Sequence, residues 1–240
     1  MIGTTVPTAK PPGGAPLERL VMACAAGRFV PHFRNRAIGR ETARLSVDAR
    51  GRLCLRSETE ITVNRFNLHQ RLEARFDAGL RPEWCIVRAK VNSQPMTLEL
   101  EIDGAGALLR SRDAGGARTV SRILRHPPLL LPDNAFAAHA LAALGALRAA
   151  VPVEPAACGA GPAAFTALPS CEVLEAAAPG RGGVLLGGHG FPPPAITLRL
   201  TPDLDEHAWI DDGWVERLMV PQAQMRVDWI RNESTKGESS

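Results

Sequence analysis

One histidine stands inside an apolar stretch, where an imidazole needs a hydrogen-bond partner. His139 lies within residues 134–148, which read Asn-Ala-Phe-Ala-Ala-His-Ala-Leu-Ala-Ala-Leu-Gly-Ala-Leu-Arg. An unpaired buried polar group costs about 1–3 kcal/mol, so we expect His139 to be satisfied within the core or to face a cavity. In a cavity it would serve as a general acid or base, with Asp133 as a second proton-transfer group, or it would anchor a polar group of a ligand.

A second group of polar residues lies between positions 203 and 212. It contains Asp203, Asp205, Glu206, His207, Asp211 and Asp212. Carboxylate oxygens suit a hard cation, but Ala208 stands where an EF-hand loop has its glycine. We therefore expect a turn with solvated carboxylates at this place, and no metal site.

The sequence signatures of the common cofactor and enzyme sites are missing from the chain. After Gly104 and Gly106, Leu109 stands where the third glycine of a dinucleotide-binding motif would fall. The sequence also lacks a Walker loop, a G-x-S-x-G elbow and an H-E-x-x-H motif. We expect no cofactor.

Apolar side chains of the predicted strands are candidates for a ligand pocket. Trp84 is the best placed of the four tryptophans, because Arg88 follows on the same face of its strand and would receive a carboxylate. The expected floor of the pocket consists of Trp84, Met96, Leu98 and Leu100. Phe136 and His139 would cover this floor from the helix side.

The elements that must position these residues follow from hydrophobic periodicity. Residues 134–148 carry apolar side chains on every face, which predicts a buried helix, with Asp133 or Asn134 as its N-cap. Elsewhere polar and apolar residues alternate with the period of half-buried strands, most regularly over 96–103. Turn residues separate these runs, as in antiparallel hairpins. We predict a mainly β fold: a curved antiparallel sheet, half-barrel or open barrel, with the one apolar helix buried on its concave side.

The domain organisation predicted from length and composition is simple. Residues 16–231 are expected to form a single β-rich domain. Residues 1–15 contain the segment Lys-Pro-Pro-Gly-Gly and are expected to form a flexible arm. The polar residues 232–240 are expected to form a disordered tail.

The charge of the chain argues against nucleic acid as a partner. The formal net charge is only +3, and the chain contains 28 basic residues, of which three are lysines. Arginines are concentrated between Arg34 and Arg56, and such a patch would suit an acidic protein partner. Aromatic residues do not alternate with these arginines as they do in single-strand binding proteins.

The cysteines and the apolar segments of the chain indicate its cellular compartment. The five cysteines show no CxxC pair and no regular spacing, which favours reduced thiols over disulfides or a structural zinc site. No window approaches the roughly 18 apolar residues that a membrane helix requires, and Glu18 and Arg19 interrupt what would be the apolar part of a signal peptide. We expect a cytoplasmic protein that is not inserted in a membrane.

Three short motifs, spread over residues 29–231, carry a resemblance of layout to a known family. They are Ile38-Gly39-Arg40-Glu41, Leu131-Pro132-Asp133-Asn134 and Asp212-Gly213-Trp214-Val215 with Val220-Pro221. The arrangement resembles the LolA-like half-barrel lipoprotein carriers and related lipid-binding domains. That resemblance implies a bent antiparallel sheet that holds an acyl chain, with helices closing its open side. The chain is expected to depart from the exported carriers, since its sequence does not predict a signal segment.

Three hypotheses of function remain open from the sequence. The first is a protein that binds a hydrophobic small molecule or lipid, with or without an acidic group, in the cavity of the curved sheet. The second is a cofactor-independent cyclase or isomerase that uses the same cavity, with His139 and Asp133 as proton-transfer groups; such an enzyme acts mainly by orienting its substrate and needs no motif. The third is an adaptor that docks an acidic partner through Arg34–Arg56.

Overall fold

The computed structural model describes most of the chain. The described residues are 16–124, 128–148, 154–158, 172–176, 184–186, 188–192, 194–201 and 203–232. The predicted arm, residues 1–15, and all of the predicted tail except Asn232 lie outside them. The predictions for these two segments stay predictions.

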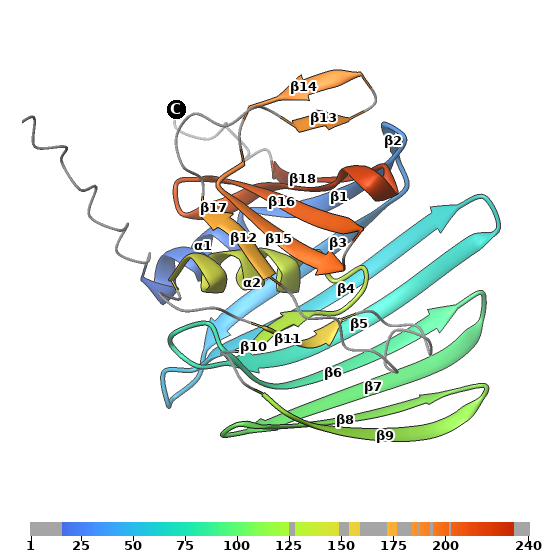
Figure 1. Ribbon diagram of the computed structural model, residues 1–240, viewed down its shortest axis with the longest axis vertical. Coiled ribbons are helices and arrows are strands. Elements are labelled where there is room, and N and C mark those ends of the chain that lie inside the picture. Colours follow the sequence, from blue (N-terminus) through green and yellow to red (C-terminus); the bar gives the residue numbers. More distant parts are fainter. Residues whose placement is uncertain are drawn as a thin grey trace, which may run out of the picture.

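One large antiparallel sheet dominates the structure (Figure 1). Its hydrogen-bonded order is β12 (Glu172–Ala176), β15 (Ile196–Thr201), β16 (Leu204–Asp211), β17 (Trp214–Val220), β18 (Met225–Arg231), β1 (Gly27–Phe33), β3 (Gly39–Val47), β4 (Leu53–Val63), β5 (Phe66–Phe76), β6 (Pro82–Val91), β7 (Gln94–Asp103), β8 (Gly106–Asp113) and β9 (Gly116–Ile123). The thirteen strands do not close, since β12 and β9 end the order, and a short β2 (Arg36–Ala37) pairs with β1. The predicted mainly β, antiparallel fold is confirmed.

The remaining elements are small. The helices are α1 (Leu17–Ala25) and α2 (Phe136–Arg148), with a 3-10 turn at Pro221–Ala223. Strands β10 (Pro128–Leu131) and β11 (Glu154–Cys158) form a parallel pair, and β13 (Val184–Leu186) and β14 (His189–Phe191) form a separate hairpin. Both main helices lie where the two blocks of strands, β3–β9 and β12–β18, meet (Figure 1).

The pairing of β1 with β18 joins these two blocks into one sheet. The register runs from Gly27 opposite Arg231 to Phe33 opposite Met225. Gly27 has no room for a larger residue, because a Cβ there would lie 2.4 Å from the carbonyl oxygen of Ile230. The ends of the β region therefore meet in the middle of the sheet.

The two faces of the sheet differ sharply in polarity over β3–β8. One face is apolar and buried, as in Leu53, Leu55 and Leu100. The opposite face carries charged side chains that pair across neighbouring strands, for example Arg56 with Glu73 at 3.4 Å. This division follows directly from the two-residue period of the strands.

Helix α2 is buried as its sequence predicted. Every residue from Phe136 to Ala146 is buried, and the helix contacts β10, β17, β15 and β3. Its predicted N-cap is wrong, however. The helix begins at Phe136, and Asn134 lies in the left-handed region with φ of 57°. The acceptor for the first helical amides comes from a strand instead, as described below.

A tight contact fixes the far end of α2. Leu80, in the turn between β5 and β6, has a positive φ of 66° and is 2 % exposed. A Cβ on Gly145 would lie 3.4 Å from the Leu80 carbonyl oxygen, so the helix approaches this turn through its glycine. A leucine in the left-handed region is strained, and the burial of its side chain against the core offsets that strain.

Candidate functional site

A row of buried polar side chains crosses the sheet next to the first turn of α2. Glu41 of β3 is paired in register with Thr59 of β4, and Thr59 with Gln70 of β5. Each of the three residues is 1 % exposed or less. Ser57, two residues before Thr59 in β4 and therefore on the same face, is also buried. Polar groups this deep in a core are costly unless they serve an interaction.

Glu41 accepts the hydrogen bond that caps α2. Its Oε2 lies 2.9 Å from the backbone nitrogen of Ala137, which donates. A carboxylate in this place satisfies an otherwise unpaired amide of the first turn, as an N-cap side chain does. Burial raises the pKa of Glu41 to about 7, and the Ser57 hydroxyl and the Ala137 amide oppose this rise. Near neutral pH the carboxyl group therefore exchanges between its two protonation states.

His139 and Glu206 form a buried pair one turn further along the helix. Nδ1 of His139 lies 2.7 Å from Oε2 of Glu206, and Nε2 lies 3.0 Å from the carbonyl oxygen of Pro132. A carbonyl oxygen only accepts, so Nε2 carries a hydrogen and donates it. Burial lowers the pKa of His139, but the charge and hydrogen bond of Glu206, the hydrogen bond to Pro132 and the charge of Asp133 together outweigh burial and raise this pKa to about 9. At neutral pH the pair is an imidazolium and a carboxylate.

This geometry is that of a histidine satisfied within the core. Both ring nitrogens of His139 are engaged, and the residue is 8 % exposed. The sequence left two alternatives for His139, hydrogen bonds within the core or a position facing a cavity. The structure shows hydrogen bonds within the core. The expectation of solvated carboxylates at 203–212 is wrong for Glu206, which is only 4 % exposed. It is confirmed for Asp211 and Asp212, which are exposed.

Glu41 and Gln70 were not among the candidate site residues of the sequence, and Glu206 was considered only as one carboxylate of an acidic turn. The signal was nevertheless present in the alternation of their strands. Glu41 is in phase with the buried Ala43 and Glu206 with the buried Ala208. Extending each apolar pattern by two residues places a carboxylate on the buried face.

An apolar cavity of about 530 Å³ adjoins the polar row. It lies where the β4–β5, β6–β7 and β8–β9 hairpins turn, and the turn before α2 forms another wall. Its lining includes Leu68, Gln70, Val91, Met96 and Asp133. Gln70 connects the two features, because its Nε2 donates to the backbone carbonyl of Asp133 at 3.0 Å. The volume falls in the range of about 300–1,000 Å³ that is usual for small-molecule sites.

The structure brings only some of the predicted pocket residues to this cavity. Met96 and Asp133 line it, and Leu98 and Leu100 follow Met96 on the same buried face of β7. Among the described residues, Phe136 and His139 are buried in α2 and do not contribute to the lining.

Trp84 and Arg88 require a correction, since they lie on the other side of the sheet. Trp84 pairs with Glu101 and Arg88 with Thr97, whereas Met96 pairs with Ala89. Side chains that pair in register share a face, so Trp84 and Arg88 belong to the charged face. The predicted floor containing both Trp84 and Met96 does not form.

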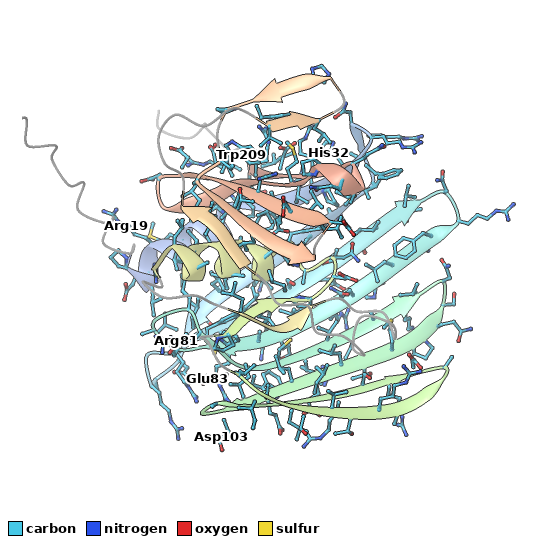
Figure 2. All side chains as sticks on the ribbon, viewed as in Figure 1. Arg19, His32, Arg81, Glu83, Asp103 and Trp209 are labelled. Carbon is cyan, nitrogen blue, oxygen red and sulfur yellow. The ribbon has the colours of Figure 1, made fainter. Side chains whose placement is uncertain are left out.

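A second cavity, of about 670 Å³, lies at the opposite end of these strands. Its walls include Arg81, Glu83 and Asp103, which Figure 2 shows at the left end of β6 and β7. Glu83 already pairs with Arg75 at 3.1 Å. Of its charged residues, Arg81 and Asp103 are exposed and the others are partly buried, and its lining is more polar than that of the first cavity.

Three cysteines are free thiols in the structure, and two of them are buried in the core. Cys24, Cys54 and Cys85 form no disulfide. Burial, together with the nearby Glu41, raises the pKa of Cys24 to about 12, and burial raises the pKa of Cys85 still further. A nucleophilic cysteine needs a lowered pKa, so the two buried thiols belong to the core.

Several arginines of the predicted docking stretch are paired with carboxylates. Arg40 lies 2.9 Å from Glu60, Arg52 lies 2.6 Å from Asp48, and Arg56 lies 3.4 Å from Glu73. These pairs reduce the excess positive charge that the sequence shows between Arg34 and Arg56.

The described residues contain no group of three or more His, Cys, Asp or Glu side chains that could hold a metal ion. None of the helices in the described parts is long and apolar enough to cross a bilayer. Comparisons with protein-family models, curated proteins and solved structures find no match to this chain.

Proposed function

We propose that the protein binds a hydrophobic small molecule or lipid in the 530 Å³ cavity beside Gln70 and Met96. The observation that carries the proposal is the apolar lining of this cavity on the buried face of the sheet. In the proposal the sheet acts as a curved half-barrel of the LolA-like kind, with α2 on its inner side. The hairpin turns at the end of β5–β8 then form the mouth of the site.

Binding is favoured over catalysis because of the position of the candidate acid and base. Asp133 lines the cavity, but both nitrogens of His139 are committed to Glu206 and Pro132. General acid–base catalysis requires a group within hydrogen-bond reach of the substrate. A binding protein has no such requirement, and an apolar wall with few polar groups suffices.

The docking of an acidic protein through Arg34–Arg56 is the weaker alternative for a different reason. Arginine–carboxylate pairs such as Arg40–Glu60 reduce the positive charge that an acidic partner would meet there. In an adaptor we would expect a cluster of arginines that no carboxylate of the same sheet opposes.

The proposal is tested by native mass spectrometry of the protein after incubation with a lipid extract, and by titration with the fluorescent dye Nile red. Met96→Trp should fill the cavity and weaken dye binding at least tenfold. Thr97→Trp is the matched control, because Thr97 is the next residue of β7, is exposed and lies on the opposite face. Equal binding by both variants and the wild type, with no lipid retained, would overturn the proposal.

A further inference from the structure

The three hairpin turns around the mouth of the 530 Å³ cavity lie along one edge of the large sheet, at the right in Figure 1. They are the β4–β5, β6–β7 and β8–β9 turns. Within three positions of these turns the chain has four basic residues, Arg65, Lys90, Arg112 and Arg118, and one acidic residue, Asp113. Asp133 adds a second carboxylate to the mouth from the turn before α2. Basic residues therefore outnumber acidic ones at this edge.

The opposite edge of the same strands has the reverse balance. Around the β3–β4, β5–β6 and β7–β8 turns, four basic residues stand within three positions, and five acidic ones. The basic residues are Arg50, Arg52, Arg75 and Arg81, and the acidic ones are Asp48, Asp77, Glu83, Glu101 and Asp103. The charge of the sheet thus changes along its strands, and the positive edge is the one that contains the mouth of the apolar cavity.

Three side chains of the positive edge form what we call the basic patch: Arg65, Lys90 and Arg112. All three are exposed, and none makes an ion pair with another described residue. The residues that lie opposite Lys90 and Arg112 on the neighbouring strands include no carboxylate; they are His69, Pro95, Thr97 and Ala117. The basic patch therefore differs from the stretch Arg34–Arg56, and its charge is available to an anion from outside.

Apolar residues of the cavity lie directly beside the basic patch. Phe66 follows Arg65 in the chain, and Pro95 is paired in register with Lys90. Both residues line the cavity, where Pro95 is exposed and Phe66 is partly buried. An acidic protein would satisfy only the charges. A bilayer with anionic lipids satisfies both features, because it offers negative head groups next to acyl chains.

We propose that this edge of the sheet docks on the anionic surface of a lipid bilayer, with Arg65, Lys90 and Arg112 against the head groups. The mouth of the cavity then faces the acyl chains, so the bilayer is the source from which the ligand enters. This inference rests on the proposed binding function and names the partner that supplies the ligand.

The test is co-sedimentation of the full-length protein with two kinds of vesicle. One kind contains phosphatidylcholine alone, and the other contains one third phosphatidylglycerol. The protein should bind the anionic vesicles at low salt and leave the neutral ones in suspension. Binding should be lost at about 1 M salt, where the Debye length is about 3 Å.

A pair of double variants locates the docking surface. Each basic residue near an anionic bilayer contributes a factor of about five in partition, so Lys90→Gln with Arg112→Gln should weaken vesicle binding at least tenfold. Arg50→Gln with Arg81→Gln is the matched control, because it removes two exposed charges from the opposite edge. The control should bind vesicles like the wild type. Lys90 and Arg112 do not line the cavity, so Nile red binding should be unchanged in their variant.

The possible results separate the two proposals. Equal binding to both kinds of vesicle, or an equal loss in both double variants, would overturn the docking inference while Nile red binding leaves the cavity site standing. Binding of poly-glutamate without binding of the anionic vesicles would assign the basic patch to an acidic protein and also overturn it. Failure of the wild type to bind Nile red would overturn the binding function, and with it the bilayer as the source of a ligand.

Discussion

Glu206 on β16 and His139 on α2 are held 2.7 Å apart although 67 positions separate them in the chain. Two residues before His139, the amide of Ala137 donates to Glu41 on β3. The first turn of the helix is therefore tied to both blocks of the sheet, to β12–β18 through one carboxylate and to β3–β9 through the other. These two contacts hold the turn at Asp133 that lines the apolar cavity.

Replacing Glu206 by Gln should lower the pKa of His139 from about 9 to below its ordinary value of 6.5. The reason is that burial, the largest contribution, then opposes only the hydrogen bond to Pro132 and the charge of Asp133. Loss of the charge of one partner of a buried ion pair should also destabilise the fold by about 3 kcal/mol. An NMR titration of the imidazole measures the first effect, and urea unfolding the second. Glu216→Gln, at an exposed position of β17, is the control. An unchanged pKa in Glu206→Gln would contradict the assignment of the pair.

The same pair predicts how stability depends on pH on the alkaline side. Because the folded-state pKa of His139 is raised, the contribution of His139 to the free energy of unfolding is fully present below about pH 6.5. It is lost as the pH rises to about 9. The free energy of unfolding of the wild type should therefore fall through this window. In Glu206→Gln the fall should disappear. Urea unfolding at a series of pH values measures both curves, and parallel curves would show that His139 is not their source.

Glu41 predicts a separate window at lower pH. Its folded-state pKa of about 7 lies above its ordinary value of 4.5, because burial favours the neutral carboxyl. The unfolded chain therefore loses this proton first, and the stability present below about 4.5 decreases as the pH rises to about 7, by about 3 kcal/mol. Glu41→Gln should remove this decrease, since an amide does not titrate.

The control for Glu41→Gln is Glu60→Gln. Glu60 lies on the neighbouring strand but is half exposed on the charged face, where it pairs with Arg40. Its removal should change the free energy of unfolding by less than about 1 kcal/mol at any pH. A retained slope between pH 4.5 and 7 in Glu41→Gln would mean that another group titrates there.

Two glycine-to-alanine changes should have opposite effects. A Cβ on Gly39 would lie 2.0 Å from the carbonyl oxygen of Glu60, on the paired strand, so Gly39→Ala should destabilise the protein by about 1–3 kcal/mol. A Cβ on Gly145 meets its nearest neighbour at 3.4 Å, and alanine stabilises a helix by up to about 1 kcal/mol relative to glycine. Gly145→Ala should therefore leave the melting temperature unchanged or raise it. A lower melting temperature would show that α2 cannot shift by the few tenths of an ångström that the contact with Leu80 requires.

The strands and the buried helix could be predicted because each is recorded in local periodicity. The alternation over 96–103 corresponds to β7, and the apolar stretch of residues 134–148 corresponds to α2. Within β6 the sequence also assigned Trp84 and Arg88 correctly to one face. It could not show which face of β6 continues which face of β7, because that depends on the register of the hairpin. The predicted pocket was therefore wrong, because it combined Trp84 with residues on the opposite face of the sheet.

The polar cluster was missed for a related reason. Glu206 stands among acidic residues that mark a turn, and a single strand pattern does not reveal the histidine that faces it from α2. His139 itself was identified because an imidazole in an apolar helix needs a partner. The identity of that partner depends on tertiary structure, as does the use of Glu41 in place of an N-cap at Asp133 or Asn134.

The pairing of β1 with β18 has a consequence for how the chain is made. Strands β3–β9 pair with their sequence neighbours, so this meander contains mostly local contacts and can assemble while translation continues. Strand β1 is synthesised before all of them, yet its pairing with β18 must wait until Arg231 has left the ribosome. Until then the apolar side chain of Phe29, which is completely buried in the finished sheet, lies beside an unpaired strand edge. Nascent chains that stop before β18 are therefore the species most in need of a chaperone.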